Sequence, residues 1–245
     1  MKITTGVHRI GSGLVNAYLV EDGGEVTIID AGMPGYWHDL PSELAAMGRS
    51  LADVRAVVLT HGHSDHIGFA ERARLELKVP VSVHELDAAL ARGETPNPAK
   101  GAGSVRIGPI LRFMLLGLRN GAFRTKNPVE VSTFGDGATL DVPGAPRVIL
   151  LPGHTPGSAA LHVPSLGALF VGDAMATVSV ASGETGPMIA PWSADRPTAV
   201  ASLARLDGIE AAWLLPGHGQ PWTGGVEAAV SKIRKNATSG DVPAR

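Results

Sequence analysis

The hydrophobic positions of the chain cluster in short runs of the kind that form buried strands. Residues 14–20, 25–29 and 54–59 are rich in Val, Ile and Leu, which favours strands. The turn sequence Asp22-Gly23-Gly24 separates the first two runs and predicts that they form a hairpin. Helical spacing of apolar residues occurs at 40–47, 67–77 and 85–92, and another strand-like run lies at 79–83.

The second half of the chain has the same alternation. Strands are expected at 147–151, 159–163, 168–171 and 211–215, and helices at 197–206 and 226–234. Runs of strands with helices between them, in both halves, predict an α/β fold in which two sheets pack face to face with helices outside. No low-complexity linker divides the sequence, so we expect a single domain over residues 1–245.

The middle of the chain departs from this pattern. Residues 95–104 are rich in Pro, Gly and small residues and are expected to form a loop. Residues 105–123 are apolar, with Arg106, Arg112 and Arg119 spaced along them. Arg112 and Arg119 share one face if the segment is helical. Three interpretations remain open: an ordinary core-facing helix, a lid over an active site, or a dimerisation surface.

Composition narrows the class of protein. Of the 245 residues, 44% are hydrophobic and 18% charged, which is sufficient for a sizeable core. The formal net charge is −2 and the Lys and Arg residues are scattered, so we expect neither nucleic acid nor a membrane as a partner. The sequence has no cysteine, which excludes disulfides, thiolate metal sites and cysteine nucleophiles.

Targeting signals are also not evident. The N-terminal residues lack the apolar segment of a signal peptide. The most apolar stretch, residues 107–118, contains Arg112 and is too short to span a bilayer. We therefore expect a cytoplasmic protein, and the lack of cysteine is compatible with a reducing compartment.

The strongest chemical signal is the sequence Thr60-His61-Gly62-His63-Ser64-Asp65-His66, which directly follows the apolar run Val57-Val58-Leu59. Three imidazoles and one carboxylate on a loop that leaves a strand can converge on one point. These are the ligand types that zinc and iron accept. Packing explains four such residues together poorly, because each would need its own buried partner.

Three further segments consist of an apolar strand, a tight turn with Gly, and then a residue of ligand type. They end in Pro152-Gly153-His154, Val171-Gly172-Asp173 and Pro216-Gly217-His218. Residues at strand ends commonly form functional sites, and glycine beside a ligand allows a sharp turn and a close approach. Each segment is a weak signal alone, but together with the histidine cluster they complete a metal-ligand set.

This pattern resembles the metallo-β-lactamase superfamily, and its ligand set is most similar to the glyoxalase II and lactonase-like branches. All five sequence landmarks of that family occur in order between Asp30 and His218. The middle of the chain is expected to form a helical insertion near 95–127. The resemblance implies a four-layer αββα sandwich with the metals at one edge between the sheets. It also implies a metal-dependent hydrolase with two Zn²⁺ ions, or with Fe or Mn in their place.

The resemblance also implies which residues bind each metal. A first triad would hold one metal and consists of His61, His63 and His154. A second triad would hold the other metal and consists of Asp65, His66 and His218. Asp173 would bridge the two metals, and Asp30 would orient ligand imidazoles without binding metal. The remaining histidines match no landmark and are expected to be structural or on the surface: His8, His38, His84 and His162. Of these, His84 directly follows a predicted strand.

In such a site a hydroxide that bridges the metals attacks a carbonyl carbon, and one metal stabilises the oxyanion. Asp65 is expected to shuttle a proton as well as to bind metal. The expected substrate is a small molecule with an ester, lactone or thioester bond. The apolar segments 105–123 and 178–192 are expected to line its pocket, and Arg112, Arg119, Arg124 or Lys126 could hold a carboxylate. The apolar middle segment also makes a homodimer reasonable.

The sequence differs from several known branches of the metallo-β-lactamase superfamily, and these differences limit the alternative functions. Only 27 residues follow His218, so we expect none of the helical C-terminal domain of true glyoxalase II. One β-lactamase subclass needs a Cys ligand, and another has no bridging Asp at the position of Asp173. A β-lactam hydrolase therefore remains an alternative. A persulfide dioxygenase-like oxidoreductase with one iron is the main rival from a different class, although Asp65 and His66 favour two metals.

Overall fold

The protein forms two β-sheets that pack face to face. The structure is a computed structural model and describes residues 1–240. The larger sheet has seven strands in chain order: β1 (Lys2–Thr4), β2 (Val7–Gly11), β3 (Asn16–Asp22), β4 (Glu25–Ile29), β5 (Val54–Val58), β6 (Val81–His84) and β7 (Ser132–Phe134). The smaller sheet has the order β13 (Trp213–Pro216), β10 (Ala168–Gly172), β9 (Ala159–Val163) and β8 (Arg147–Leu150). A separate hairpin joins β11 (Ala176–Val178) and β12 (Thr185–Met188).

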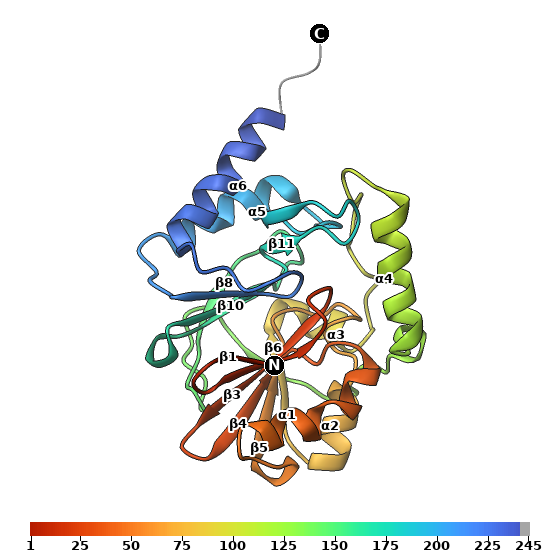
Figure 1. Ribbon diagram of the computed structural model, residues 1–245, viewed down its shortest axis with the longest axis vertical. Coiled ribbons are helices and arrows are strands. Elements are labelled where there is room, and N and C mark those ends of the chain that lie inside the picture. The colour runs from red at the N-terminus through yellow and green to blue at the C-terminus, as the bar shows by residue number, and fades with distance from the viewer. Residues whose placement is uncertain (241–245) are drawn as a thin grey trace.

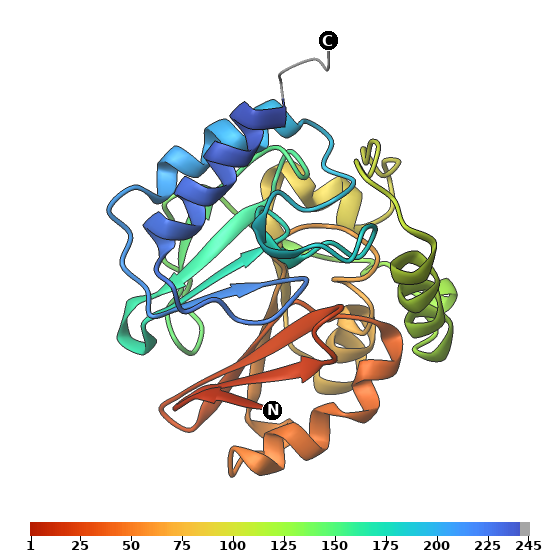
Figure 2. The same cartoon turned by 45° about the horizontal axis from the view of Figure 1, so that its top comes forward.

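Helices lie on the outer faces of the two sheets and, in one case, at an edge of the molecule (Figure 1). They are α1 (Leu40–Ala46), α2 (Ala70–Leu77), α3 (Ala88–Ala91), α4 (Ile107–Arg119), α5 (Arg196–Ser202) and α6 (Val226–Gly240). Figure 1 shows α1 and α2 beside the larger sheet and α5 and α6 beside the smaller one. In Figure 2 the two sheets lie between these two groups of helices.

The buried side chains form three apolar clusters, one for each interface between layers. The first packs α1 and α2 on the larger sheet through residues such as Leu44 and Ala73. The second packs α5 and α6 on the smaller sheet. The third lies between the sheets, where Tyr18 meets Phe170 edge to face with ring centroids 5.3 Å apart. Three apolar interfaces require four layers, and the predicted αββα sandwich is confirmed.

Most of the predicted elements are present. The strands expected at 14–20 and 25–29 pair antiparallel as β3 and β4, as the turn sequence predicts. The helix expected from residue 67 begins only at Ala70, because the preceding residues still belong to the loop after β5, where the N–H of Ile67 donates to the carbonyl of His63. The pattern does not predict β1, β7, β11 and β12, since strands of three or four residues carry almost no periodicity.

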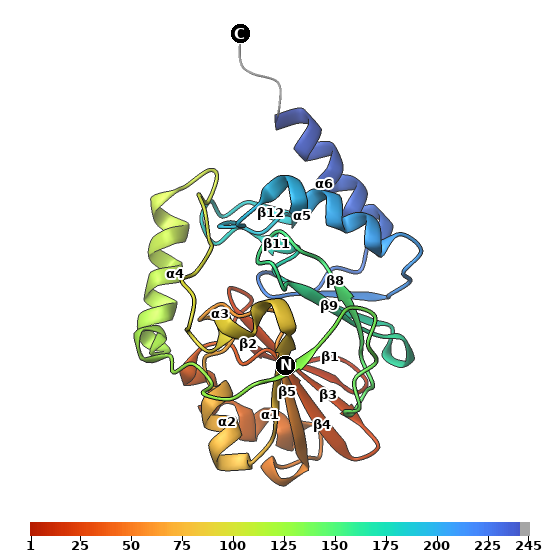
Figure 3. The same cartoon turned by 180° about the vertical axis from the view of Figure 1, so that it is seen from behind.

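Helix α4 is not an ordinary core-facing helix. Only Gly117 is buried in it, while Phe113 and Leu116 pack against the first cluster from one side. Its other side is apolar and exposed. Figures 1 and 3 show α4 at the outer edge of the molecule, beside the β11–β12 hairpin. No helix within residues 1–240 is long and apolar enough to cross a membrane.

Candidate metal centre

Four strands deliver the predicted ligands to one edge of the sandwich. The loop after β5 carries His61, His63, Asp65 and His66, and the segments after β8, β10 and β13 carry the other three. Six of the seven side chains are buried, and Asp65 is partly exposed. The structure therefore brings together every residue in which the sequence predicted metal-ligating chemistry.

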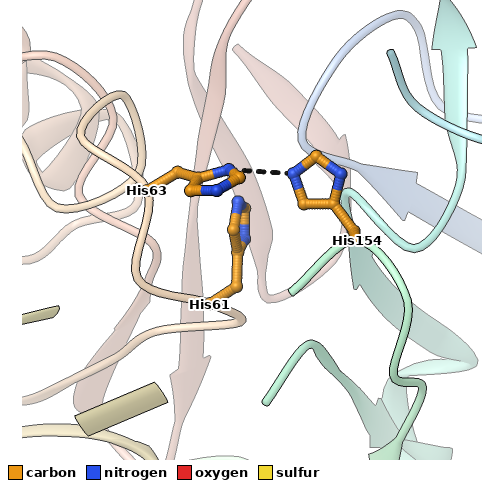
Figure 4. A group of neighbouring side chains, drawn as sticks. All are labelled: His61, His63 and His154. Carbon is orange, nitrogen blue, oxygen red and sulfur yellow. Dashed lines mark hydrogen bonds between the residues drawn. The ribbon is translucent and has the colours of Figure 1, made fainter. Parts of the chain in front are cut away.

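The first triad converges from two loops. Potential ligand atoms of His61, His63 and His154 all lie within 4.8 Å of one another. Figure 4 shows the three rings pointing toward one another, with Nδ1 of His63 facing Nε2 of His154 at 2.9 Å. Three imidazoles in this arrangement can bind one divalent metal ion.

The second triad adjoins the first through Asp173. Potential ligand atoms of Asp65, His66 and His218 again lie within 4.8 Å of one another. Oδ1 of Asp173 is 3.5 Å from Nε2 of His66. Oδ2 of Asp173 is 3.0 Å from Nε2 of His218 and 3.4 Å from Nε2 of His154. The carboxylate thus lies between the two triads, in a position suited to a bridging ligand.

Hydrogen bonds hold the outer nitrogens of four of these imidazoles. Nδ1 of His66 lies 3.0 Å from Oδ2 of Asp30. Nδ1 of His61 lies 3.1 Å from the Thr60 hydroxyl. The other two contacts are His154 Nδ1 to the Ser193 hydroxyl at 3.1 Å, and His218 Nδ1 to the carbonyl of Leu14. A partner on the outer nitrogen fixes the ring and directs Nε2 inward, as is usual for metal-binding histidines.

Asp30 supports the loop as well as the ring of His66. It has a positive φ of 57°, and its carboxylate accepts hydrogen bonds from the N–H and the hydroxyl of Thr60. These contacts agree with the orienting role that the resemblance implies for Asp30.

Several buried polar atoms of the centre lack hydrogen-bond partners. Eight buried side-chain nitrogen or oxygen atoms in residues 1–240 have none, and four belong to this centre: Nε2 of His61, His63 and His66, and Oδ1 of Asp173. Unpaired buried polar atoms are costly and call for an explanation. Bound metal ions would satisfy Nε2 of His61 and His66 and Oδ1 of Asp173, so the residues fit a metal centre.

The electrostatics differ between the two triads. Burial lowers the pKa of His61, and it lowers the pKa of His154 to about 3. Both rings are therefore neutral at pH 7, the form that binds metal. Burial would lower the pKa of His66 too, but the surrounding carboxylates, Asp173 foremost, raise it to about 10. The second triad thus favours a positive charge, which a divalent cation can supply.

Glycine at position 217 allows the closest approach within the centre. A Cβ atom there would lie 2.3 Å from Oδ1 of Asp173 and 2.4 Å from Cε1 of His66. Both distances are far below van der Waals contact. The sequence-based expectation that glycines beside the ligands permit close approach is confirmed at this position.

The sequence did not identify Asp87 as part of the site. Its buried carboxylate accepts hydrogen bonds from the N–H groups of Gly62 and Gly157 and from the hydroxyl of Thr155. It therefore links the loop that carries His61 and His63 to the loop that carries His154. No local motif indicated this, because Asp87 lies in an unremarkable helical stretch of the sequence.

The other histidines lie outside the groups that could hold a metal within residues 1–240. Nδ1 of His84 accepts a hydrogen bond from the N–H of Leu86, and its ring packs edge to face on Phe134. His8 contacts Glu43, and His162 contacts the carbonyl of Glu210.

An aromatic wall lies beside the second triad. The ring of Phe113 from α4 stacks on Trp192 at 6.2 Å between centroids and meets the His218 ring edge to face at 6.1 Å. The two apolar segments that the sequence predicted to line a pocket therefore touch here. Trp192 has a positive φ of 58°, an uncommon conformation for a bulky residue.

An αββα sandwich with histidines and carboxylates gathered at one sheet edge is typical of metal-dependent hydrolases. Comparison of the chain with known protein families supports this assignment. The family model for the metallo-beta-lactamase superfamily matches residues 10–218. The chain therefore belongs to the metallo-beta-lactamase superfamily.

Individual relatives are consistent with this family. The chain is 30% identical to the "Probable metallo-hydrolase YflN" of Bacillus subtilis (strain 168) over 89% of its own length and 86% of the relative. A metallo-beta-lactamase family protein from Thermus thermophilus is similar in structure, with a TM-score of 0.69, 25% identity, and 97% and 81% of the two chains covered. The protein TTHA1623, solved in a di-iron-bound form, is 28% identical with a TM-score of 0.61 and coverage of 90% and 96%.

Proposed function

We propose that the chain is a dinuclear zinc hydrolase that cleaves an ester, lactone or thioester bond in a small molecule. The observation that supports this most strongly is the position of Asp173. Oδ1 of Asp173 faces His66 of the second triad, and Oδ2 lies between His218 of the second triad and His154 of the first. A carboxylate between two sets of ligands is in a position to bind a metal ion in each of them.

The proposed ligand sets follow the two triads. His61, His63 and His154 would hold one zinc ion, and the residues of the second triad would hold the other, with Asp173 shared. Two such ions supply Lewis acidity, which lowers the pKa of water toward neutrality and polarises a carbonyl oxygen. The neutral state of His61 and His154 prepares the first triad for a metal without loss of a proton.

Asp65 has the position of a proton carrier. Its side chain is 22% exposed, whereas His66 and His218 beside it are buried. Its Oδ2 lies 3.5 Å from Nε2 of His218. A carboxylate that borders both the metal ligands and solvent can accept a proton from the attacking water and release it toward the leaving group.

The aromatic wall of Phe113 and Trp192 favours an apolar substituent on the substrate. Phe113 touches the second triad at His218, so a substrate bound at the metals would lie against this wall. An acyl chain would bury apolar surface there without the need for a charged partner.

The proposal is tested by initial rates and metal content measured together. The zinc-loaded protein is assayed against an aryl ester, an acyl-homoserine lactone, a glutathione thioester and a cephalosporin reporter, each with and without chelator. We expect chelator-sensitive turnover of an ester, lactone or thioester with two zinc ions per chain. Turnover of the cephalosporin alone, or oxygen-dependent activity with one iron per chain, would refute the proposal in favour of a β-lactam hydrolase or an oxidoreductase. Loading zinc, iron or manganese into separate samples identifies the metal that supports turnover.

A further inference from the structure

Helix α4 presents a large apolar face to solvent. The residues on this face have helical spacing and are between 45% and 86% exposed: Ile107, Leu111, Met114, Leu115 and Leu118. Val105 and Phe123, just outside the two ends of the helix, are 59% and 83% exposed. Soluble proteins rarely leave such a continuous apolar strip uncovered without a binding role. We call these seven residues the α4 outer face.

The outer face belongs to a helix that is fixed in place. Phe113 and Leu116 pack against the first apolar cluster from the opposite side of α4. The N–H of Arg106 donates to the carbonyl of Ala181, and the N–H of Gly35 donates to the carbonyl of Asn120. The outer face therefore points away from both the core and the metal centre, which Phe113 meets from the inner side. It cannot be part of the substrate pocket.

The charged side chains of the segment that carries this face are all positive. Residues 95–129 contain six basic residues and no acidic one, although the whole chain has a net charge of −2. All six are exposed, and within residues 1–240 none of them makes an ion pair: Lys100, Arg106, Arg112, Arg119, Arg124 and Lys126. With about 100° of rotation per residue, Arg112 and Arg119 lie along one border of the apolar strip. The net charge of the whole chain conceals this local concentration.

We propose that the α4 outer face binds the surface of an anionic lipid membrane. An amphipathic helix with an apolar strip bordered by Arg and Lys is suited to lie at the interface, with apolar side chains among the acyl chains and cations at the headgroups. Its 13 residues are too few to cross a bilayer, so the helix lies along the surface. This departs from the expectation drawn from the net charge of the whole chain.

A second copy of the chain fits this face less well. In a symmetric dimer the same surface would meet itself, so the six basic residues of one copy would face those of the other. The segment has no acidic residue to pair with them, and like charges across an interface are unfavourable. Negative lipid headgroups complement the charge that a second copy would repel.

The test is co-sedimentation of the full chain with vesicles of phosphatidylcholine, with or without phosphatidylglycerol. We expect binding only when the anionic lipid is present, and loss of binding at about 0.5 M salt, where charges are strongly screened. The double variant Leu111→Glu/Leu118→Glu should bind at least about tenfold more weakly. Leu75→Glu on α2 is the matched control, because Leu75 is 59% exposed outside the segment, and it should bind like the unaltered chain.

The lack of cysteine in the chain allows a second measurement that does not depend on sedimentation. In Leu118→Cys, labelled with a polarity-sensitive fluorophore, we expect a blue shift on anionic vesicles, and in labelled Leu75→Cys no shift. Equal binding to neutral and anionic vesicles, or none to either, would overturn the proposal. A dimer in solution that Leu111→Glu/Leu118→Glu dissociates, without vesicle binding, would overturn it in favour of self-association. None of these results depends on catalytic activity.

Discussion

The carboxylate of Asp87 accepts a hydrogen bond from the N–H of Gly62 at 2.9 Å, at the residue that separates His61 from His63. The other oxygen of the same carboxylate accepts from the N–H of Gly157 at 2.7 Å, three residues after His154. One buried side chain thus sets the separation of the two loops that form the first triad. The geometry of the proposed metal centre depends on a residue that touches none of its ligand atoms.

Replacement of Asp87 by Asn should therefore weaken metal binding as well as the fold. An amide has one acceptor oxygen, so at least one donor of Gly62, Thr155 or Gly157 would face an NH₂ group. We expect a loss of about 1–3 kcal/mol in the free energy of unfolding. We also expect metal affinity to fall about 10- to 100-fold, measured by competition with a chromophoric chelator.

The matched control for this variant is Asp136→Asn. Asp136 accepts a hydrogen bond from the N–H of Leu150 at 2.9 Å within strand β8 and pairs with Arg205, but no hydrogen bond joins it to residues 151–157. Asp136→Asn should lower the free energy of unfolding without a change in metal affinity. Equal metal affinity in Asp87→Asn and the unaltered chain would show that the carboxylate has no positioning role.

Gly217→Ala should disrupt both triads through a single methyl group. The new Cβ would overlap the Asp173 carboxylate and the His66 ring, so at least one of them has to move. We expect less than two metal ions per chain, by elemental analysis after gel filtration. Gly135→Ala is the control, since nothing lies within 4 Å of a Cβ at that position. Full metal content in Gly217→Ala would contradict the close packing around Asp173.

The metal ligands were predictable because their signals are local. His61, His63, Asp65 and His66 lie within six positions directly after an apolar run, and the other three follow strands of the same kind. The contacts that orient them are not local. Asp87 is 25 residues from Gly62, and the carbonyl that holds His218 belongs to Leu14, 204 residues away. Such pairings follow from how the sheets pack, which no run of neighbouring residues encodes.

Local sequence patterns also fail to determine how α4 packs against the rest of the molecule. The apolar spacing predicts a helix with an apolar face, and the structure has that helix at Ile107–Arg119. Periodicity alone does not say which side meets the core. In the structure the strip from Ile107 to Leu118 faces solvent, while Phe113 and Leu116 face inward.

Removal of a ligand from the first triad should abolish catalysis without unfolding the chain. In His154→Ala we expect turnover of the substrate found in the panel to fall by orders of magnitude, and metal content to fall below two ions. Metal should also stabilise the variant less, because a ligand that binds only the folded state stabilises it by RT ln(1 + [L]/Kd), and the loss of a ligand residue raises Kd. Melting temperatures with and without zinc measure this difference.

His162→Ala is the control for loss of an imidazole as such. His162 is buried and contacts the carbonyl of Glu210, away from both triads. His162→Ala should keep full metal content and turnover.

Asp65→Asn, like His154→Ala, should lose turnover by orders of magnitude. If Asp65→Asn or His154→Ala remained near normal in activity with its metal content verified, the assigned roles would be wrong.

Phe113 should control the preference for long apolar substrates. Its ring stacks on Trp192 and meets His218, so Phe113→Ala would remove the wall nearest the metals. For a series of substrates with increasing acyl length, we expect kcat/KM of the unaltered protein to rise by a factor of about 4 per buried CH₂ group, which corresponds to about 0.8 kcal/mol. In Phe113→Ala this dependence should flatten, while the rate for the shortest substrate changes little.

Phe123→Ala separates this effect from the loss of a phenyl ring elsewhere in the same segment. Phe123 is 83% exposed and lies outside the aromatic wall, so its removal should leave the dependence on chain length intact. Circular dichroism of both variants checks that they are folded, because Phe113 also packs against the first apolar cluster. A flat dependence on acyl length in the unaltered protein would mean that the aromatic wall does not bind the substrate, and the hydrolase would then have to recognise its substrate through other groups around the metals.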